Sequence, residues 1–188
     1  MARQIFYFDQ PRRFVVGTVG QPGERVFFLQ ASDDHRTVSV ALEKSQVTIL
    51  AERMEQLLTE VAARAGLAVP DAVEPDVDPL ENPVDEEFRV AAMGLAYDAE
   101  SGLVVIEAQA EADSPETAEA TLLEDTEDGP DALRVRIEHR AAIGFIERAR
   151  RVIAAGRPPC SLCNQPLDPS GHICPRNNGY RRRPALDV

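Results

Sequence analysis

The sequence has no tryptophan and few other aromatic residues, only seven Phe and three Tyr among 188 residues. Aromatic platforms that stack bases or sugars are therefore scarce. No apolar run approaches the roughly 18 residues that a membrane-spanning helix needs. The residues from Met1 to Asp9 also lack the apolar core and the small-residue cleavage site of a secretion signal. We therefore expect a cytoplasmic protein that does not contact a membrane.

Cysteine and lysine are scarce as well. The three cysteines all lie between positions 160 and 174, and this odd, closely spaced set argues against a disulfide framework that links distant parts of the chain. Lys44 is the single lysine, so arginine supplies nearly all of the basic charge. Hydrophobic residues make up 44% and charged residues 28% of the chain, which is typical of a globular protein.

The net charge of −12 is concentrated in two segments. Residues 66–87 and residues 113–131 each carry eight acidic groups and no basic group, so the rest of the chain has a net charge of +4. Both segments contain prolines and few large apolar residues, which is typical of solvated linkers and loops. A second interpretation is that they are negative arms, which fold over an arginine-rich face or compete for it.

The first half of the chain has the pattern of three strands followed by a helix. Strands at 14–20 and 25–31 flank a Pro-Gly turn, and residues 37–42 alternate between apolar and polar side chains. Apolar residues at helical spacing then follow from Val47 onward, and Gly66 is a natural helix terminator.

The second half repeats this pattern. Strands are predicted at 88–97, 103–110 and 133–137, and a helix at about 140–155. A shift of 95 residues places the apolar positions of the third strand and the helix of the first half on those of the second half without a gap. We interpret this match as an internal duplication of a β-β-β-α unit, although any amphipathic strand and helix can be aligned by chance.

These units predict an α+β fold. Neither unit can bury its apolar surface alone, so we expect one antiparallel-sheet domain, built as a single sheet or as two small sheets, with two helices on its apolar face and Ile5–Phe8 as a further strand. The predicted organisation is a duplicated domain at 1–156 (repeat 1 at about 14–65, acidic linker at 66–87, repeat 2 at about 88–156 with an acidic loop at 113–131) and a zinc knuckle-like tail at 157–183.

The seam between the two repeats is a natural place for a ligand, since pockets often form between packed units. Gln30 aligns there with Gln109. These two side chains could bind a polar ligand or simply face solvent on the open side of the sheet.

The most specific chemical motif is Cys160-x-x-Cys163 followed by His172-x-Cys174. Cys-x-x-Cys has the spacing of a zinc knuckle, and three thiolates with one imidazole complete a tetrahedral zinc site. A closed set of four protein ligands favours a structural zinc ion over a catalytic one. The alternatives are three free thiols beside an incidental histidine, or a redox Cys-x-x-Cys, which the prolines at 158–159 and the absence of a following helix disfavour.

Several stretches resemble a known family. They are Phe14–Gly20 (FVVGTVG), Phe27–Ala31 (FFLQA), Glu86–Leu95 (EEFRVAAMGL), Val105–Ala110 (VIEAQA) and the cysteine motif with its continuation to Tyr180. Together they resemble the actinobacterial family catalogued as a domain of unknown function (3090), sometimes labelled a repeat protein. The resemblance covers nearly the whole chain and implies no established activity. It also implies candidate partners, because members tend to be encoded beside a phosphoglycerate-mutase-like phosphatase and a lipid-kinase-like protein.

Three classes of function remain open. The first is a protein-interaction or adaptor module, which explains a closed zinc site and acidic arms suited to electrostatic recognition of another protein. The second is RNA or DNA binding through the arginine-rich helix at 140–155 and the zinc tail. Its anion or nucleic-acid contacts would be Arg140, Arg148, Arg151, Arg157, Arg176, Arg181 and Arg182. The third is an enzyme or a small-ligand binder at the seam, for which we predict no catalytic residue because no Ser or Cys has a recognisable base partner.

Overall fold

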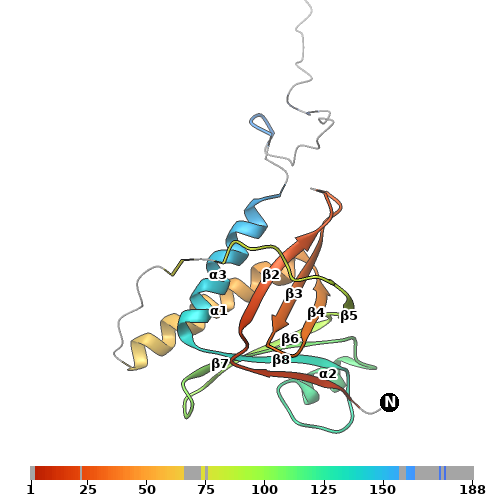
Figure 1. The fold of residues 1–188 in the computed structure, drawn as a ribbon, viewed down its shortest axis with the longest axis vertical. Helices are drawn as coiled ribbons and strands as arrows, with labels where there is room; N and C mark the ends of the chain where they lie inside the picture. The colour runs from red at the N-terminus through yellow and green to blue at the C-terminus, as the bar shows by residue number, and fades with distance from the viewer. Residues whose placement is uncertain are drawn as a thin grey trace, which may run out of the picture.

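The strands form two four-stranded sheets in the computed structural model, which describes residues 3–21, 23–65, 73–74, 76–156, 160–163, 174 and 176. In chain order the elements are β1 (Ile5–Asp9), β2 (Arg13–Val19), β3 (Val26–Ser32), β4 (Thr37–Leu42), α1 (Lys44–Ala65), β5 (Glu86–Arg89), β6 (Ala92–Asp98), β7 (Leu103–Gln109), α2 (Pro115–Thr121), β8 (Ala132–Ile137) and α3 (His139–Ala154). Figure 1 shows α1 and α3 together on one side of the sheets and α2 at the opposite end.

Each half of the chain contributes a strand to the sheet of the other half. Sheet I has the strand order β2-β3-β4-β5, and sheet II has the order β1-β8-β7-β6. The three strands that follow one another in the chain are antiparallel in both sheets. The fourth strand pairs in parallel in both, β5 beside β4 and β1 beside β8. Neither half therefore completes its sheet alone.

The long helices cross between the halves in the same way. α1 follows β4 of sheet I and packs against β6 of sheet II, whereas α3 follows β8 of sheet II and packs against β2 of sheet I. α1 and α3 also pack against each other (Figure 1). Buried side chains recur along α1 at helical spacing and join both sheets and α3 in one continuous core. The apolar positions predicted for the third strands belong to this core: Val38, Val40, Leu42, Leu133, Val135 and Ile137.

The predicted α+β class is confirmed, and of the two predicted arrangements the structure has two small sheets rather than a single sheet. Antiparallel pairs dominate as predicted, but each sheet also contains one parallel pair, and the strand predicted at 88–97 is two strands. Val90 N donates to Ala41 O of sheet I at 2.8 Å, whereas Ala91 N donates to Gln109 O of sheet II at 2.8 Å. The chain therefore passes from one sheet to the other between these two residues.

The prediction of two helices is wrong, because a third helix, α2, lies inside the acidic loop at 113–131. Ser114 caps it by accepting a hydrogen bond at Oγ from Thr117 N at 3.1 Å, and Pro115 occupies its first turn. Both residues are favourable at a helix start. The acidic composition concealed this helix start in the sequence.

The spacing of the elements agrees with the shift found in the sequence. β4 and β8 begin at Thr37 and Ala132, and α1 and α3 begin at Lys44 and His139, in both cases 95 residues apart. The duplication itself stays a prediction.

The register of the sheets corrects one detail of the predicted repeat. Gln30 lies opposite Ser39, and Glu107 lies opposite Arg134, which follows Ser39 by 95 residues. Under the offset of 95 residues, Gln30 therefore matches Glu107, two residues before the Gln109 with which it was aligned.

The acidic linker covers the outer face of sheet I, the face opposite the main core. Residues 76–84, which we call the linker strap, place the buried Leu80 against Val15, Phe28 and Ala41. Gly17 makes room for it, since a Cβ at that position would lie 2.5 Å from Leu80 Cγ. Residues 77–79 and 82–83 of the strap are exposed, as predicted for a solvated linker, and Leu80 anchors the strap to the sheet.

The acidic loop covers part of the outer face of sheet II in a similar manner. Residues 115–131, which we call the loop strap, carry Leu122 and Leu123 across Gly94, where a Cβ would lie 3.0 Å from each Cγ. Both straps thus follow the second interpretation of the acidic segments, as arms folded over the domain. Among the described residues, none of the helices combines the length and the apolar character needed to cross a membrane.

Candidate functional site

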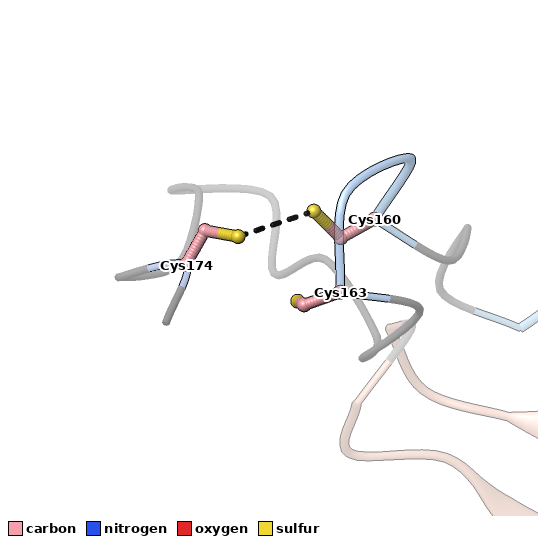
Figure 2. Close-up of side chains that lie close together, drawn as sticks. All are labelled: Cys160, Cys163 and Cys174. Atoms are coloured by element: carbon pink, nitrogen blue, oxygen red, sulfur yellow. Dashed lines mark hydrogen bonds between the residues drawn. The ribbon is translucent and has the colours of Figure 1, made fainter. Parts of the chain in front are cut away.

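The three cysteines converge on one point. The Sγ atoms of Cys160, Cys163 and Cys174, which we call the cysteine cluster, lie within 4.8 Å of one another. Cys160 and Cys163 lie on one turn, and Cys174 faces them from a separate segment (Figure 2). Cys160 and Cys174 are buried, and none of the three cysteines forms a disulfide.

The spacing of two of these thiols matches that of neighbouring ligands in a tetrahedral zinc site. Four ligands around zinc with Zn–S bonds of about 2.3 Å place neighbouring sulfurs about 3.8 Å apart. The Cys160 and Cys174 Sγ atoms are 3.8 Å apart. The cluster could therefore hold a metal ion without rearrangement of these two side chains.

Backbone groups favour the metal-binding form of the cluster. The amide N–H groups of Cys163 and Leu162 lower the pKa of the Cys160 thiol and so favour its thiolate, the form that binds metals. The Leu162 N–H group donates to Cys160 Sγ at 3.4 Å. Arg176 donates from Nη1 to Leu162 O at 3.1 Å and ties the segment after Cys174 to the turn.

The structure brings together three of the four predicted metal ligands, Cys160, Cys163 and Cys174, whereas His172 lies outside the described residues. Only some of the predicted anion contacts lie among the described residues. Three of them are exposed on the surface, Arg140, Arg151 and Arg176, whereas three others lie outside the described residues, Arg157, Arg181 and Arg182.

Arg148, the remaining predicted contact, is not on the surface of its helix, because its residue is only 6% exposed. It follows Phe145 by three residues and precedes Ala149, so the helical period places it on the core-facing side of α3. Its Nε donates to Val16 O at 2.7 Å. Burial lowers the pKa of Arg148, and a nearby carboxylate opposes that effect.

That carboxylate belongs to Asp76 of the linker strap. Arg13 donates from Nε to Asp76 Oδ2 at 2.6 Å and from Nη2 to Oδ1 at 2.8 Å. Arg148 donates from Nη1 to Oδ1 at 2.6 Å. The hydrogen bond from Arg13, opposed by burial, lowers the pKa of Asp76 and keeps the carboxylate ionised. We call this arrangement the Asp76 clamp.

A second charged cluster lies beneath the loop strap. Glu107 is fully buried and accepts hydrogen bonds from Arg3 Nη2 at 2.9 Å and from Arg134 Nε at 2.5 Å. Its Oε1 also accepts from the Leu123 N–H group of the strap at 3.2 Å. Arg134 in turn pairs with Asp125. We call these residues the Glu107 cluster, and no motif in the sequence points to it, because Arg3 and Glu107 are more than a hundred residues apart.

Of the two alternatives for Gln30 and Gln109, the one in which they face solvent is wrong, since their residues are 1% and 0% exposed. Gln30 exchanges hydrogen bonds with the Glu81 backbone, accepting from N at 2.8 Å and donating to O at 2.9 Å. Gln109 donates to Glu107 Oε1 at 2.9 Å and to Thr121 Oγ1 at 3.3 Å. The two glutamines therefore anchor different straps and do not share a seam.

Fold and site together define a two-sheet α+β protein with a C-terminal cysteine cluster that could hold a metal ion. The model of the family described as "Protein of unknown function (DUF3090)" matches residues 6–174, and the chain belongs to this family. A search of curated proteins and a search of solved structures each found no match. The function therefore has to be argued from the site.

Proposed function

We propose that this protein is a zinc-containing adaptor, a protein-interaction module whose C-terminal segment is organised by one structural Zn²⁺ ion. The ligands would be Cys160, Cys163, His172 and Cys174. The observation that carries the proposal is the convergence of three thiol groups within 4.8 Å. Thiolate and imidazole are the ligands that structural zinc sites use, and a segment of roughly 30 residues is too short to build an apolar core of its own.

A zinc ion bound in this way would stabilise the fold of the segment and supply no reactive water, because four protein ligands fill its coordination sphere. The chain itself would hold the thiolates in place through the Leu162 amide and the Arg176 side chain. Leu162 is 49% exposed on the turn between the first two cysteines. We propose that the metal fixes this apolar side chain as part of the surface that docks a partner.

An adaptor is favoured over a nucleic-acid binder by the state of the arginines. Four arginines form ion pairs within the domain: Arg13, Arg134 and Arg148 with the two straps, and Arg136 with Asp98 at the end of β6. Cations engaged in this way are not available to neutralise phosphates, which supply most of the affinity for nucleic acids. Binding of RNA or DNA through Arg140, Arg151 and the tail is the alternative outcome of the experiment below.

The family resemblance suggests which partners to test first. We propose a phosphoglycerate-mutase-like phosphatase or a lipid-kinase-like protein, because family members tend to be encoded beside such proteins. We also propose that the two halves arose by duplication of a β-β-β-α unit, which predicts that residues 14–62 overlay on residues 88–154 strand for strand. The common offset of 95 residues between β4 and β8 and between α1 and α3 supports this.

The test is to purify the tagged protein from its native host, once with and once without nuclease treatment, beside two variants. Cys163→Ser removes a proposed ligand, and Ser161→Ala changes an exposed residue of the same turn as a matched control. We expect a stoichiometric protein partner with the wild type and with Ser161→Ala, and its loss with Cys163→Ser. Capture of RNA or DNA in place of a protein, or equal capture by all three chains, would contradict the proposal.

A further inference from the structure

We propose that the cleft between β2 and α3 binds a small ligand that joins an oxyanion group to an apolar body, a role that goes beyond the adaptor function. The cleft has a volume of about 350 Å³, within the range of small-molecule sites. Four arginines line it: Arg12, Arg13, Arg140 and Arg148.

The Asp76 clamp shows which chemical group these arginines recognise. Arg13 grips the Asp76 carboxylate with two of its nitrogens, and Arg148 adds a third donor at 2.6 Å. This forked geometry suits a carboxylate and a phosphate oxygen pair alike. Arg148 is only 6% exposed, so its guanidinium is held in place by packing before any ligand arrives. The clamp is therefore a preformed oxyanion site that a side chain of the protein occupies.

Arg140 supplies a free cation in the same cleft. It is exposed, and it forms no hydrogen bond or ion pair with any residue in the part of the chain that the structure describes. Glu74 and Glu138 also line the cleft, and Arg12 is already paired with Glu81. An oxyanion that takes the place of Asp76 would therefore be bound by Arg13 and Arg148 of the clamp, with Arg140 as the additional cation.

The rest of the lining is apolar and leaves space for the body of a ligand. Phe14 and Phe145 stack at a centroid distance of 4.9 Å with an interplanar angle of 10°. Gly144 lies beside them, and the nearest atom to a Cβ built on it would be Val73 Cγ1 at 3.7 Å. An aromatic or aliphatic group of modest size fits such a surface, whereas a bare inorganic anion leaves it uncovered.

The Asp76 side chain can leave the clamp while the linker strap stays bound to sheet I. Leu80 is packed in the outer cluster of sheet I, and Gln30 holds the Glu81 backbone through two hydrogen bonds. These anchors are independent of the clamp. The ligand would therefore compete with one side chain and would not need to displace the whole linker strap.

The experiment is an NMR titration of the full chain with phenyl phosphate and with benzoate, which separate phosphate from carboxylate ligands. Two control compounds separate the parts of the ligand: benzyl alcohol has the apolar body without an oxyanion, and inorganic phosphate has the oxyanion without an apolar body. Asp76→Asn frees the clamp and keeps an oxygen for the Asp78 N–H group, which now bonds to Asp76 Oδ1. Arg140→Gln removes the free cation, and Arg151→Gln is the matched control on an exposed position of the same helix.

We expect phenyl phosphate, benzoate or both to shift the amide resonances of Phe14, Ala141 and Gly144 more strongly than either control compound. The dissociation constant should fall about tenfold in Asp76→Asn, rise about fivefold in Arg140→Gln and stay unchanged in Arg151→Gln. If Asp76→Asn does not fold, the comparison of wild type with the two arginine variants decides. The proposal is overturned if no cleft resonance shifts at about 10 mM ligand, a concentration that detects even weak binding, or if both arginine variants weaken binding equally.

Discussion

The two-sheet domain and the cysteine cluster are stabilised by different interactions. The domain has one continuous apolar core, and its buried charged groups find partners within the chain, as Glu107 does in Arg3 and Arg134. The cysteines are not part of that core, and their three thiols lie close enough together to hold a metal ion. The difference predicts that the domain folds without help from a ligand, and it supports the proposal that a zinc ion organises the C-terminal segment.

The largest effect is expected from Glu107→Ala. It leaves Arg3 and Arg134 beneath the loop strap without their common carboxylate, and an uncompensated buried charge costs about 3–5 kcal/mol. Urea unfolding should show this loss of stability. Glu43→Ala is the control, because Glu43 is an exposed carboxylate paired with Arg89, and such pairs contribute about 0–1 kcal/mol. A loss below about 1 kcal/mol for Glu107→Ala would contradict the role of the cluster.

A smaller effect is expected where the linker strap meets sheet I. Gly17→Ala places a Cβ 2.5 Å from Leu80 Cγ, and such overpacking costs about 1–3 kcal/mol. The double variant Gly17→Ala/Leu80→Ala removes the overlap, so its loss should be smaller than the sum of the two single losses. Gly144→Ala is the control, since its Cβ meets only Val73 at 3.7 Å and alanine favours a helix. Additive losses in the double variant would show that Leu80 does not pack on Gly17.

The Asp76 clamp predicts a dependence of stability on pH. The folded state lowers the pKa of Asp76, so this group stabilises the domain above the unfolded pKa of about 3.9, and the contribution is lost as pH falls through the folded pKa. Asp76→Asn should reduce the free energy of unfolding by about 1–3 kcal/mol at pH 7. The difference from wild type should be smaller at about pH 2 than at pH 7, because protonation of Asp76 removes the charge that the clamp holds. Thermal unfolding at both pH values measures it, and an equal difference at both would contradict the clamp.

The smallest effect on the domain is expected from removal of metal. Treatment with a chelator should leave the main thermal transition within about 1 °C of its original value, because none of the cysteines belongs to the core. Amide exchange at Cys160–Cys163 should accelerate in the same sample, since the segment loses its organiser. A fall of the main transition by more than about 5 °C would show that domain and cluster are coupled.

The elements that the sequence predicted correctly are those set by local periodicity. The alternation of Val38, Val40 and Leu42 and the matching residues 95 positions later identified buried strands, and the close spacing of Cys160, Cys163 and Cys174 identified the thiol cluster. Both patterns depend on residues that are near one another in the chain. Their physical consequences therefore survive any arrangement of the rest of the fold.

The features that the sequence did not predict depend on contacts between distant segments. One such feature is the exchange of β1 and β5 between the sheets, because the sequence of a short edge strand does not show which strand it pairs with. The burial of Arg148 is another: an arginine beside Phe145 on a helix is expected at the surface unless a remote carboxylate such as Asp76 neutralises it. The packing of the acidic straps on the sheets could not be predicted either, because only a few residues such as Leu80 anchor a segment that is otherwise polar.

The most direct test of the proposed structural zinc ion is its stoichiometry. The full chain, purified under reducing conditions without a chelator, would be analysed for metals by mass spectrometry beside Cys163→Ser, with circular dichroism to confirm that the domain of both is folded. The account predicts about one zinc ion per chain in the wild type and almost none in the variant. A wild-type content near zero, or equal zinc in both chains, would contradict it.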